Sequence, residues 1–203
     1  MCSSDLWGLA ERVPVLMTPS DCASGSDRLA AALPALEALV PGCGWVVNVQ
    51  GDQPFLDPQL IDGLAAAALA SGAADPPVLT PVYPLPSGRL HDPAVVKVVR
   101  SHSGRALLFS RSALPHVRDL PPDDWHRAGP YWGHVGLYAY RLEVLRRWPS
   151  LPPSSLEQAE KLEQLRLLEA DVAIGCLETA EDAFSVDTAA QLAEARRRCG
   201  PAG

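Results

Sequence analysis

Long apolar runs are missing from this sequence, and none approaches the roughly 20 residues that a helix needs to cross a bilayer. The first residues also lack the charged stretch followed by an apolar stretch that is typical of a secretory signal. A basic excess is missing as well: the formal net charge is −7, whereas a protein that binds phosphate backbones presents a basic face. We therefore expect a cytoplasmic protein that binds neither membranes nor nucleic acids, although a few basic residues in a pocket could still hold a small anionic substrate.

Closely spaced cysteines and internal repeats are also absent. The five cysteines are Cys2, Cys22, Cys43, Cys176 and Cys199. Their number is odd and their spacing never matches Cys-x-x-Cys, so we predict neither a disulfide framework nor a zinc site. What is present is an ordinary globular composition of 203 residues, 47% of them hydrophobic and 20% charged. This composition and length suit one folded domain.

Apolar runs rich in β-branched residues alternate with segments of helical spacing. Strands are expected at residues 45–50, 77–85, 94–101, 105–111, 133–141 and 171–178. Helices are expected at residues 27–40, 57–71, 154–170 and 188–199. Strands that alternate with helices predict a three-layer α/β domain. Ligands of such sheets bind beyond the carboxyl ends of the strands.

The predicted helices carry local start signals. Asp27 and Asp57 stand where N-caps are expected, and Pro58 suits the first turn of a helix. Pro34 argues against an unbroken first helix. Residues 154–170 give the clearest helical pattern, and their Ser-x-x-Glu start fits a capping box.

Two aspartates are candidate metal ligands because each follows an apolar strand-like run. Asp52 follows the strand predicted at 45–50, and Asp187 follows a short apolar run and precedes the last helix. Carboxylates at strand ends suit Mg²⁺, which takes one or two of them together with phosphate oxygens. Each aspartate also has an ordinary structural use, as a turn residue for Asp52 and as a helix N-cap for Asp187.

Five stretches of the sequence, in this order, carry the pattern of a known family. They are CASGSDRLA (22–30), VVNVQGDQPFLDPQLI (46–61), DPAVVKVVRSHSGRALLFSRSALP (92–115), GHVGLYAYRLEVLRRW (133–148) with SSLEQAEKLEQLRLLE (154–169), and VDTAAQLAEAR (186–196). Together they resemble the 3-deoxy-manno-octulosonate cytidylyltransferases, or CMP-Kdo synthetases, over nearly all of residues 13–198. The resemblance implies a nucleotide-diphospho-sugar-transferase fold with a mixed, mostly parallel sheet, a homodimer, and Mg²⁺. It also implies transfer of CMP from CTP to Kdo, with release of pyrophosphate, in lipopolysaccharide biosynthesis.

The resemblance assigns metal and sugar roles to four positions. Asp52 and Asp187 match the family's catalytic, metal-binding aspartates. His134 and Tyr138 match its sugar-site histidine and tyrosine. A spacing of four along a strand places both of these side chains on one face, although a lone histidine on an apolar strand more often has a structural role.

Five further positions are candidate substrate contacts. Glu163 and Gln164 match the family's sugar-binding pair, which can hold hydroxyl groups by hydrogen bonds. Arg111 is a candidate for the Kdo carboxylate, because a guanidinium offers a planar bidentate fork. Arg28 is a second cationic candidate, and Gln50 could reach ligand atoms from the end of its strand.

Two features depart from the family pattern. Gln53 stands where the family usually has glutamate, which removes a negative charge beside Asp52. The glycine-rich, basic loop that cradles the CTP phosphates in the family is also not found. We therefore expect residues 1–12 to be a non-native start and residues 13–203 to be the C-terminal two-thirds or more of the cytidylyltransferase domain. Such a form would lack the first strand and the phosphate loop, and we expect it to be inactive with CTP.

Other functions remain open from the sequence. A cytidylyltransferase for another acidic sugar, such as sialic acid, would share the fold and the metal site. An inactive fragment or a binding protein is the non-enzymatic alternative.

Overall fold

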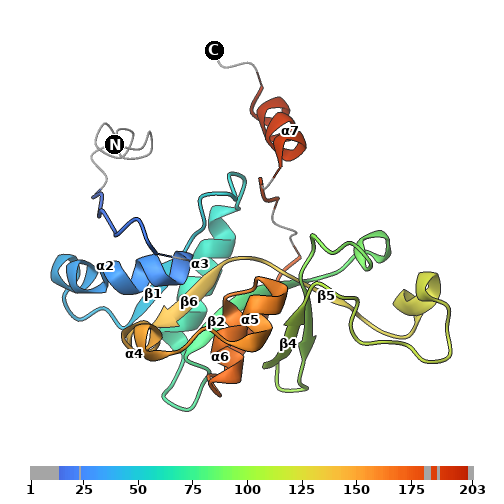
Figure 1. Cartoon of the computed structure of the whole chain (residues 1–203), viewed down its shortest axis with the longest axis horizontal. Helices are drawn as coiled ribbons and strands as arrows, with labels where there is room; N and C mark the ends of the chain where they lie inside the picture. Colours follow the sequence, from blue (N-terminus) through green and yellow to red (C-terminus); the bar gives the residue numbers. More distant parts are fainter. Residues whose placement is uncertain (1–13, 23, 181–183, 187, 201–203) are drawn as a thin grey trace.

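The protein is described by a computed structural model that covers residues 14–22, 24–180, 184–186 and 188–200 (Figure 1). Its centre is a seven-stranded sheet. The strands are β1 (Trp45–Asn48), β2 (Val78–Pro84), β3 (Lys97–Arg100), β4 (Ala106–Ser110), β5 (Trp132–His134), β6 (Tyr138–Arg141) and β7 (Ile174–Glu178). Within the described ranges, no helix has the length and apolar character needed to cross a membrane.

Strands β5 and β6 form one interrupted line through the middle of the sheet. Both pair with β2, β6 through Val78 and Leu79 and β5 through residues 82–84. On the other side of this line, β6 pairs with β1, and β5 pairs with β3. Strand β7 runs along the second edge of β2, and β4 closes the opposite end of the sheet by pairing with β3.

The expectation of a mostly parallel sheet is wrong for neighbouring strands. Among the described strand pairs, only β2 with β7 is parallel. The β5–β6 line runs against both of its neighbours, and β3 and β4 are joined by a turn too short for a crossover helix. Strand β1 is also only half-buried over most of its length, although its apolar, β-branched residues are typical of a buried strand.

Helices cover both faces of the sheet, as expected for three layers. Helices α2 (Gly25–Leu39), α4 (Leu142–Arg147) and α6 (Gln164–Glu169) cover one face, where their apolar residues share a core with Val78, Phe109 and Ile174. Helix α3 (Pro58–Ala70) covers the other face and packs on β1, β2 and β6. The α/β class is therefore confirmed.

The first helix differs from its prediction at its start. Helix α2 begins at Gly25, and Ser24 is its N-cap, with Oγ accepting from the Asp27 amide at 3.1 Å. Asp27 lies inside the first turn, where its Oδ1 accepts from Trp148 Nε1 at 2.7 Å. The helix continues through Pro34. Helix α3 confirms its prediction, because Asp57 caps it and Pro58 lies in its first turn.

The helix predicted over residues 154–170 is two helices. The capping box of Ser154 is present, but α5 (Ser155–Glu160) stops at Lys161, which has a left-handed backbone with φ of 55°. Helix α6 then starts at Gln164. The prediction is wrong here because a continuous apolar pattern does not reveal a single left-handed residue.

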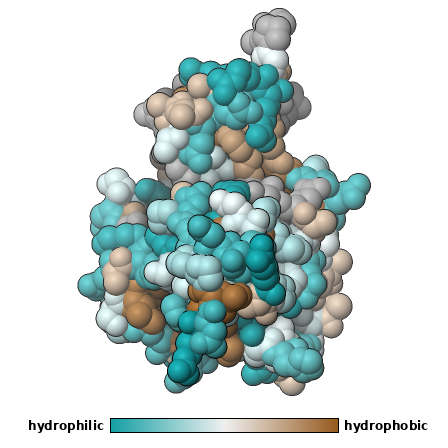
Figure 2. Space-filling model, turned by 90° about the vertical axis from the view of Figure 1, so that its right-hand side faces the viewer, coloured by the Kyte–Doolittle hydropathy of each residue, from teal (hydrophilic) through white to brown (hydrophobic). Residues whose placement is uncertain are grey.

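The last helix, α7 (Ala189–Cys199), stands apart from the sheet in Figure 1, and the same projection forms the upper part of Figure 2. Its N-cap is Thr188. The Arg198 guanidinium carbon lies 4.2 Å from the ring centre of Phe184, which in turn contacts Phe55.

Candidate functional site

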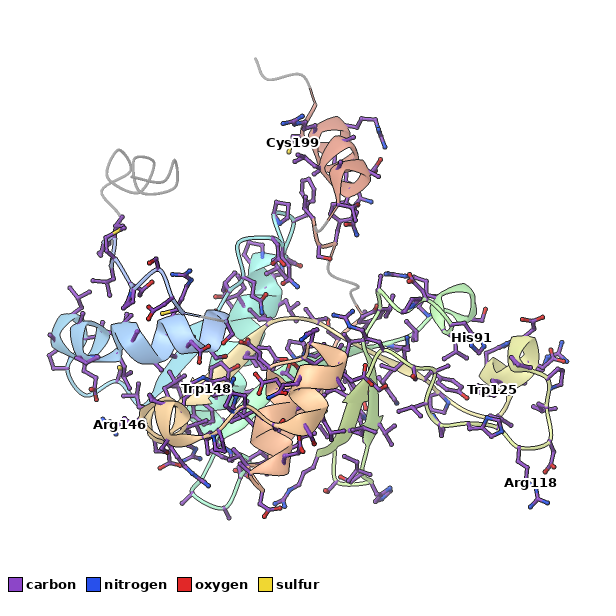
Figure 3. All side chains as sticks on the ribbon, viewed as in Figure 1. His91, Arg118, Trp125, Arg146, Trp148 and Cys199 are labelled. Carbon is purple, nitrogen blue, oxygen red and sulfur yellow. The ribbon has the colours of Figure 1, made fainter. Side chains whose placement is uncertain are left out.

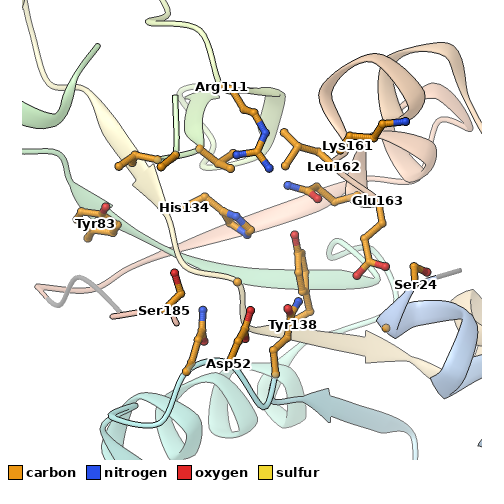
Figure 4. A pocket seen from close by; sticks show the side chains of 18 of the residues that line it. Ser24, Asp52, Tyr83, Arg111, His134, Tyr138, Lys161, Leu162, Glu163 and Ser185 are labelled. Atoms are coloured by element: carbon orange, nitrogen blue, oxygen red, sulfur yellow. The ribbon is translucent and has the colours of Figure 1, made fainter. Parts of the chain in front are cut away.

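A cavity of about 620 Å³ opens at the carboxyl end of β1 and at the break between β5 and β6 (Figure 4). Seven of the residues predicted to form the site line it: Gln50, Asp52, Arg111, His134, Tyr138, Glu163 and Gln164. They come from four separate parts of the chain. Charges are separated within the cavity, because Arg111 and Lys161 lie at one side and Asp52 at the opposite side (Figure 4).

Asp52 lies in the loop after β1 and presents an unpaired acceptor to the cavity. Its Oδ1 is buried and has no hydrogen-bond partner among the described residues, and neither has Oε1 of the adjacent Gln53. The Asp52 carbonyl accepts from the amide of Val186 at 2.8 Å, so the segment before Asp187 lies beside it. Asp187 itself lies outside the described residues. A buried carboxylate oxygen without a donor suits a cation.

The break between β5 and β6 places two aromatic side chains in the cavity wall. His134 ends β5 and Tyr138 begins β6, and their ring centres are 5.3 Å apart. Gly136 lies in the break, where a Cβ atom would meet the Gln53 side chain at 3.0 Å. The spacing of four therefore brings both rings to one cavity, although the strand is interrupted between them.

His134 is held neutral. Its Nε2 lies 3.0 Å from Oγ1 of the fully buried Thr80, and its ring packs edge-on against Phe109. Burial lowers the pKa of His134 to about 3. The imidazole therefore enters any chemistry at neutral pH as an uncharged group.

We expect His134 to make the protein sensitive to acid. The unfolded chain binds this proton near the ordinary pKa of 6.5 and the folded protein only near 3. The contribution of His134 to stability is therefore complete above pH 6.5 and is lost as the pH falls towards 3. Between pH 7 and pH 5 the free energy of unfolding should fall by about 1–2 kcal/mol more in the wild type than in His134→Gln. Urea unfolding at the two pH values measures this difference, and equal losses would contradict it.

Glu163 and Gln164 reach the cavity from the start of α6. Glu163 Oε2 accepts from the Ser26 amide at 3.2 Å, which ties this turn to the first turn of α2. Gln164 is 3% exposed, and its Nε2 has no hydrogen-bond partner among the described residues. The Gln164 amide is therefore a buried donor available to a ligand.

Arg111 follows β4 and is held by backbone carbonyls. Its Nε donates to the Glu160 carbonyl at 2.9 Å and its Nη1 to the Pro93 carbonyl at 3.1 Å. Within the described residues, no carboxylate lies within ion-pair distance of this guanidinium, and Nη2 makes no hydrogen bond. The fixed fork therefore leaves positive charge and donors for a ligand.

Lys97 stabilises the wall next to Arg111. It is 1% exposed, and its Nζ donates to the carbonyls of Asp92 at 2.8 Å and Val95 at 2.7 Å. Burial lowers the pKa of this amine. The two bonds hold the segment that contributes Ala94 and Val95 to the cavity lining.

Arg28 is not brought to the cavity, contrary to the prediction. Its Nη1 donates to Thr18 Oγ1 at 2.9 Å and to the Pro19 carbonyl at 3.3 Å, on the exposed side of α2. The difference arises because Thr18 and Pro19 hold the Arg28 side chain on the exposed side of the helix, whereas Ser24 and Gly25 line the cavity from the start of α2.

Several further residues that the sequence does not predict for the site also line the cavity. They are Ser24, Gly25, Gln53, Tyr83, Arg89, Lys161 and Ser185, among others. Ser24, Lys161 and Ser185 lie inside or next to the stretches that carry the family pattern, so their proximity to those motifs was an available signal. No comparable signal marked Tyr83 or Arg89.

A group of charged residues supports the cavity from behind. Arg166 is buried, and its Nε and Nη2 donate to Glu157 at 2.7 and 2.6 Å. Its Nη1 lies 3.5 Å from Asp27, and its guanidinium carbon lies 4.8 Å from the ring centre of Trp148, which Figure 3 labels. Hydrogen bonding to Glu157 raises the pKa of Arg166. These contacts join the starts of α2, α5 and α6.

Comparisons with known proteins identify the family of this chain. A family model described as cytidylyltransferase matches residues 9–174. The chain is 45% identical over 186 residues to the 3-deoxy-manno-octulosonate cytidylyltransferase of Chlorobaculum tepidum, over 90% of this chain and 71% of that protein. It is 39% identical over 183 residues to the protein of the same name from Porphyromonas gingivalis, and the match covers 89% of this chain and 70% of that protein. A solved structure of CMP:2-keto-3-deoxy-manno-octonic acid synthetase complexed with CTP is similar with a TM-score of 0.83 and 34% identity, over 96% of this chain and 76% of that one.

Proposed function

This chain belongs to the cytidylyltransferase family, and we propose that it transfers CMP from CTP to the anomeric hydroxyl of 3-deoxy-D-manno-octulosonate (Kdo). The products are CMP-Kdo and pyrophosphate. The similar proteins named for this reaction support the proposal. The single observation that carries it is the cavity, which places a carboxylate at one side and, at the other, a guanidinium that backbone carbonyls hold and that forms no ion pair with any described residue. We further propose that the reaction serves lipopolysaccharide biosynthesis in the cytoplasm and that the enzyme is a homodimer.

The carboxylate side of the cavity fits Mg²⁺ and the phosphates. Asp52 offers a buried oxygen that accepts no hydrogen bond from a described residue. The amide of Val186, which precedes Asp187 in the sequence, donates to the Asp52 carbonyl. We propose Asp52 and Asp187 as the ligands. Bound there with the triphosphate, Mg²⁺ would neutralise charge that develops on the phosphate oxygens.

The opposite side of the cavity fits an acidic sugar. The fixed fork of Arg111 suits the sugar carboxylate, because two parallel N–H donors match its two oxygens. His134, Tyr138, Glu163 and Gln164 surround the same space with groups that hydrogen-bond to hydroxyls. Gln50 also lines the cavity, two positions before Asp52, and offers a further polar contact.

The proposed reaction is a direct displacement at phosphorus. The anomeric oxygen of the sugar forms a bond to the α-phosphorus, the bond from that phosphorus to the pyrophosphate oxygen breaks, and the hydroxyl proton is released. The residues of the cavity would contribute by holding the hydroxyl in line and by neutralising charge, which are the main sources of rate in phosphoryl transfer. A covalent enzyme intermediate is not required.

Pyrophosphate release tests the proposal directly. The protein is incubated with Mg²⁺, CTP and Kdo, and then with UTP or ATP in place of CTP and with N-acetylneuraminate in place of Kdo. We expect release that depends on both CTP and Kdo, because the cavity holds groups suited to the metal and to the sugar. No release at all would instead agree with the inactivity that the sequence predicts from the missing phosphate loop. Release with N-acetylneuraminate would favour a cytidylyltransferase for sialic acid, and release with UTP in place of CTP would overturn the proposed nucleotide.

Arg111→Gln is expected to raise the KM for Kdo by about 10- to 100-fold, because a charge-assisted hydrogen bond contributes roughly 1.5–3 kcal/mol. The KM for CTP should stay within about twofold. Arg118→Gln is the matched control, since Arg118 is a strongly exposed arginine in the segment between β4 and β5 (Figure 3). An equal rise of both KM values for Arg111→Gln would place Arg111 at the nucleotide.

A further inference from the structure

We propose that Thr80 fixes the tautomer of His134, so that Nε2 carries the proton and Nδ1 faces the cavity as a hydrogen-bond acceptor. Thr80 is then a positioning residue, because it acts on a ligand only through His134. The observation behind this inference is the bond of 3.0 Å between Thr80 Oγ1 and His134 Nε2, in which either atom can be the donor.

The hydroxyl proton of Thr80 is committed to the backbone. Its Oγ1 lies 2.8 Å from the carbonyl of Leu137 and 3.2 Å from that of Val135. The Val135 carbonyl already accepts from the Leu137 amide at 2.7 Å. A hydroxyl has one proton to donate, and the shorter contact assigns it to Leu137. Thr80 therefore faces His134 as an acceptor, and Nε2 must supply the proton.

Proline explains why a backbone carbonyl here needs a side-chain donor. Pro81 follows Thr80 in β2 and has no amide proton to give to the opposite strand. The paired residues shift at this place, from Leu79 opposite Ala139 to Val82 opposite His134. A buried carbonyl without a donor costs free energy, and the hydroxyl of Thr80, which is 0% exposed, supplies that donor.

Packing fixes the orientation of the imidazole. Phe109 and Tyr138 contact the ring at centroid distances of 5.1 and 5.3 Å. With Nε2 bonded to Thr80, Nδ1 is the remaining polar atom of the ring, and no described residue bonds to it. Burial also lowers the pKa of His134, so the acceptor stays unprotonated at neutral pH.

An acceptor at Nδ1 selects the ligand group that it faces. A hydroxyl can donate to it, whereas a carboxylate or phosphate oxygen cannot. This step rests on the proposed function. In the complex with the sugar, His134 Nδ1 therefore accepts a hydrogen bond from a sugar hydroxyl, and the sugar carboxylate is directed towards Arg111. An Nδ1–H tautomer would favour the opposite orientation.

The tautomer can be measured without substrate or activity. The ring nitrogens of ¹⁵N-labelled histidine report by NMR which of them carries the proton, and the spectrum of His134→Gln identifies the signals of His134. We expect Nε2–H in the wild type and in Thr80→Ser. Thr80→Val should give Nδ1–H or a mixture. Nδ1–H in the wild type, or unchanged Nε2–H in folded Thr80→Val, would overturn the proposal.

Kinetics test the consequence for the ligand. Thr80→Val should raise the KM for Kdo by about 3- to 10-fold, as expected for one neutral hydrogen bond, with the KM for CTP unchanged and with Thr80→Ser close to the wild type. An equal change of both KM values would overturn the assignment to a sugar hydroxyl. A wild type that does not use Kdo at all would refute the proposed function, whereas the NMR result would still decide the tautomer. If Thr80→Val does not fold, the wild-type and Thr80→Ser spectra decide it.

Discussion

Asp52→Asn is expected to reduce pyrophosphate release from CTP and Kdo by about a hundredfold or more. The substitution keeps the size of the side chain and removes the negative charge that we propose binds Mg²⁺. Metal stabilisation of transferring phosphates is worth several kcal/mol, and each 1.36 kcal/mol corresponds to about a factor of ten. The fold should persist, because Asp52 Oδ1 has no protein partner to lose among the described residues.

Asp57→Asn is the matched control for this experiment. Asp57 lies five positions along the same segment, where its Oδ1 caps α3 by accepting from the Gln59 amide at 2.8 Å. Asparagine also caps helices, so this variant loses one negative charge and little else. It should keep its turnover and its affinity for Mn²⁺, measured by titration in the presence of CTP. Turnover of Asp52→Asn close to that of Asp57→Asn would remove Asp52 from the metal site.

Arg166→Met is expected to lower the free energy of unfolding by about 3–5 kcal/mol, the usual cost of leaving a buried charge without its partner. Arg166 and Glu157 have side chains that are 8% and 13% exposed, and both nitrogens of the fork contact the carboxylate. The variant also loses the stacking on Trp148. Urea unfolding measures the change.

Two further variants separate the causes. Arg166→Lys keeps the charge but cannot form the bidentate contact, so its free energy of unfolding should fall by less than that of Arg166→Met. The double variant Arg166→Met with Glu157→Gln removes the unpaired carboxylate and should recover part of the stability. A fall of less than about 1 kcal/mol in the free energy of unfolding of Arg166→Met would contradict this prediction, because it would show that water solvates the remaining carboxylates at little cost. The KM for Kdo should rise in parallel with the loss, because Arg166 supports the turn that carries Glu163.

Local signals in the sequence predicted several elements correctly. Asp57 caps α3, and Ser154 with Glu157 forms the capping box of α5. These interactions join residues two or three positions apart, so the local chain is sufficient to form them. The alternation of strand and helix patterns likewise predicted the α/β class, which depends on the burial of one face of each element.

Local signals in the sequence gave wrong predictions where residues distant in the chain compete for the same side chain. Asp27 looks like an N-cap, but its carboxylate accepts from Trp148 and lies near Arg166, and Ser24 takes the cap. Burial alone would raise the pKa of Asp27, yet the hydrogen bonds of Trp148 and Ser24 and the charge of Arg166 lower it. A sequence pattern cannot rank such partners, because they lie far apart in the chain.

Local sequence patterns were sufficient to predict the class of fold, the caps of α3 and α5, and the candidate residues of the site. Which of these residues lie together depends on the tertiary structure. It brings Ser26 to Glu163 across 137 positions and Thr80 to His134 across 54, and it turns Arg28 away. The physical reason is that caps and periodicity arise from neighbouring residues, whereas the cavity and the tautomer of its histidine arise from the register of strands and the packing of helices that are distant in the chain.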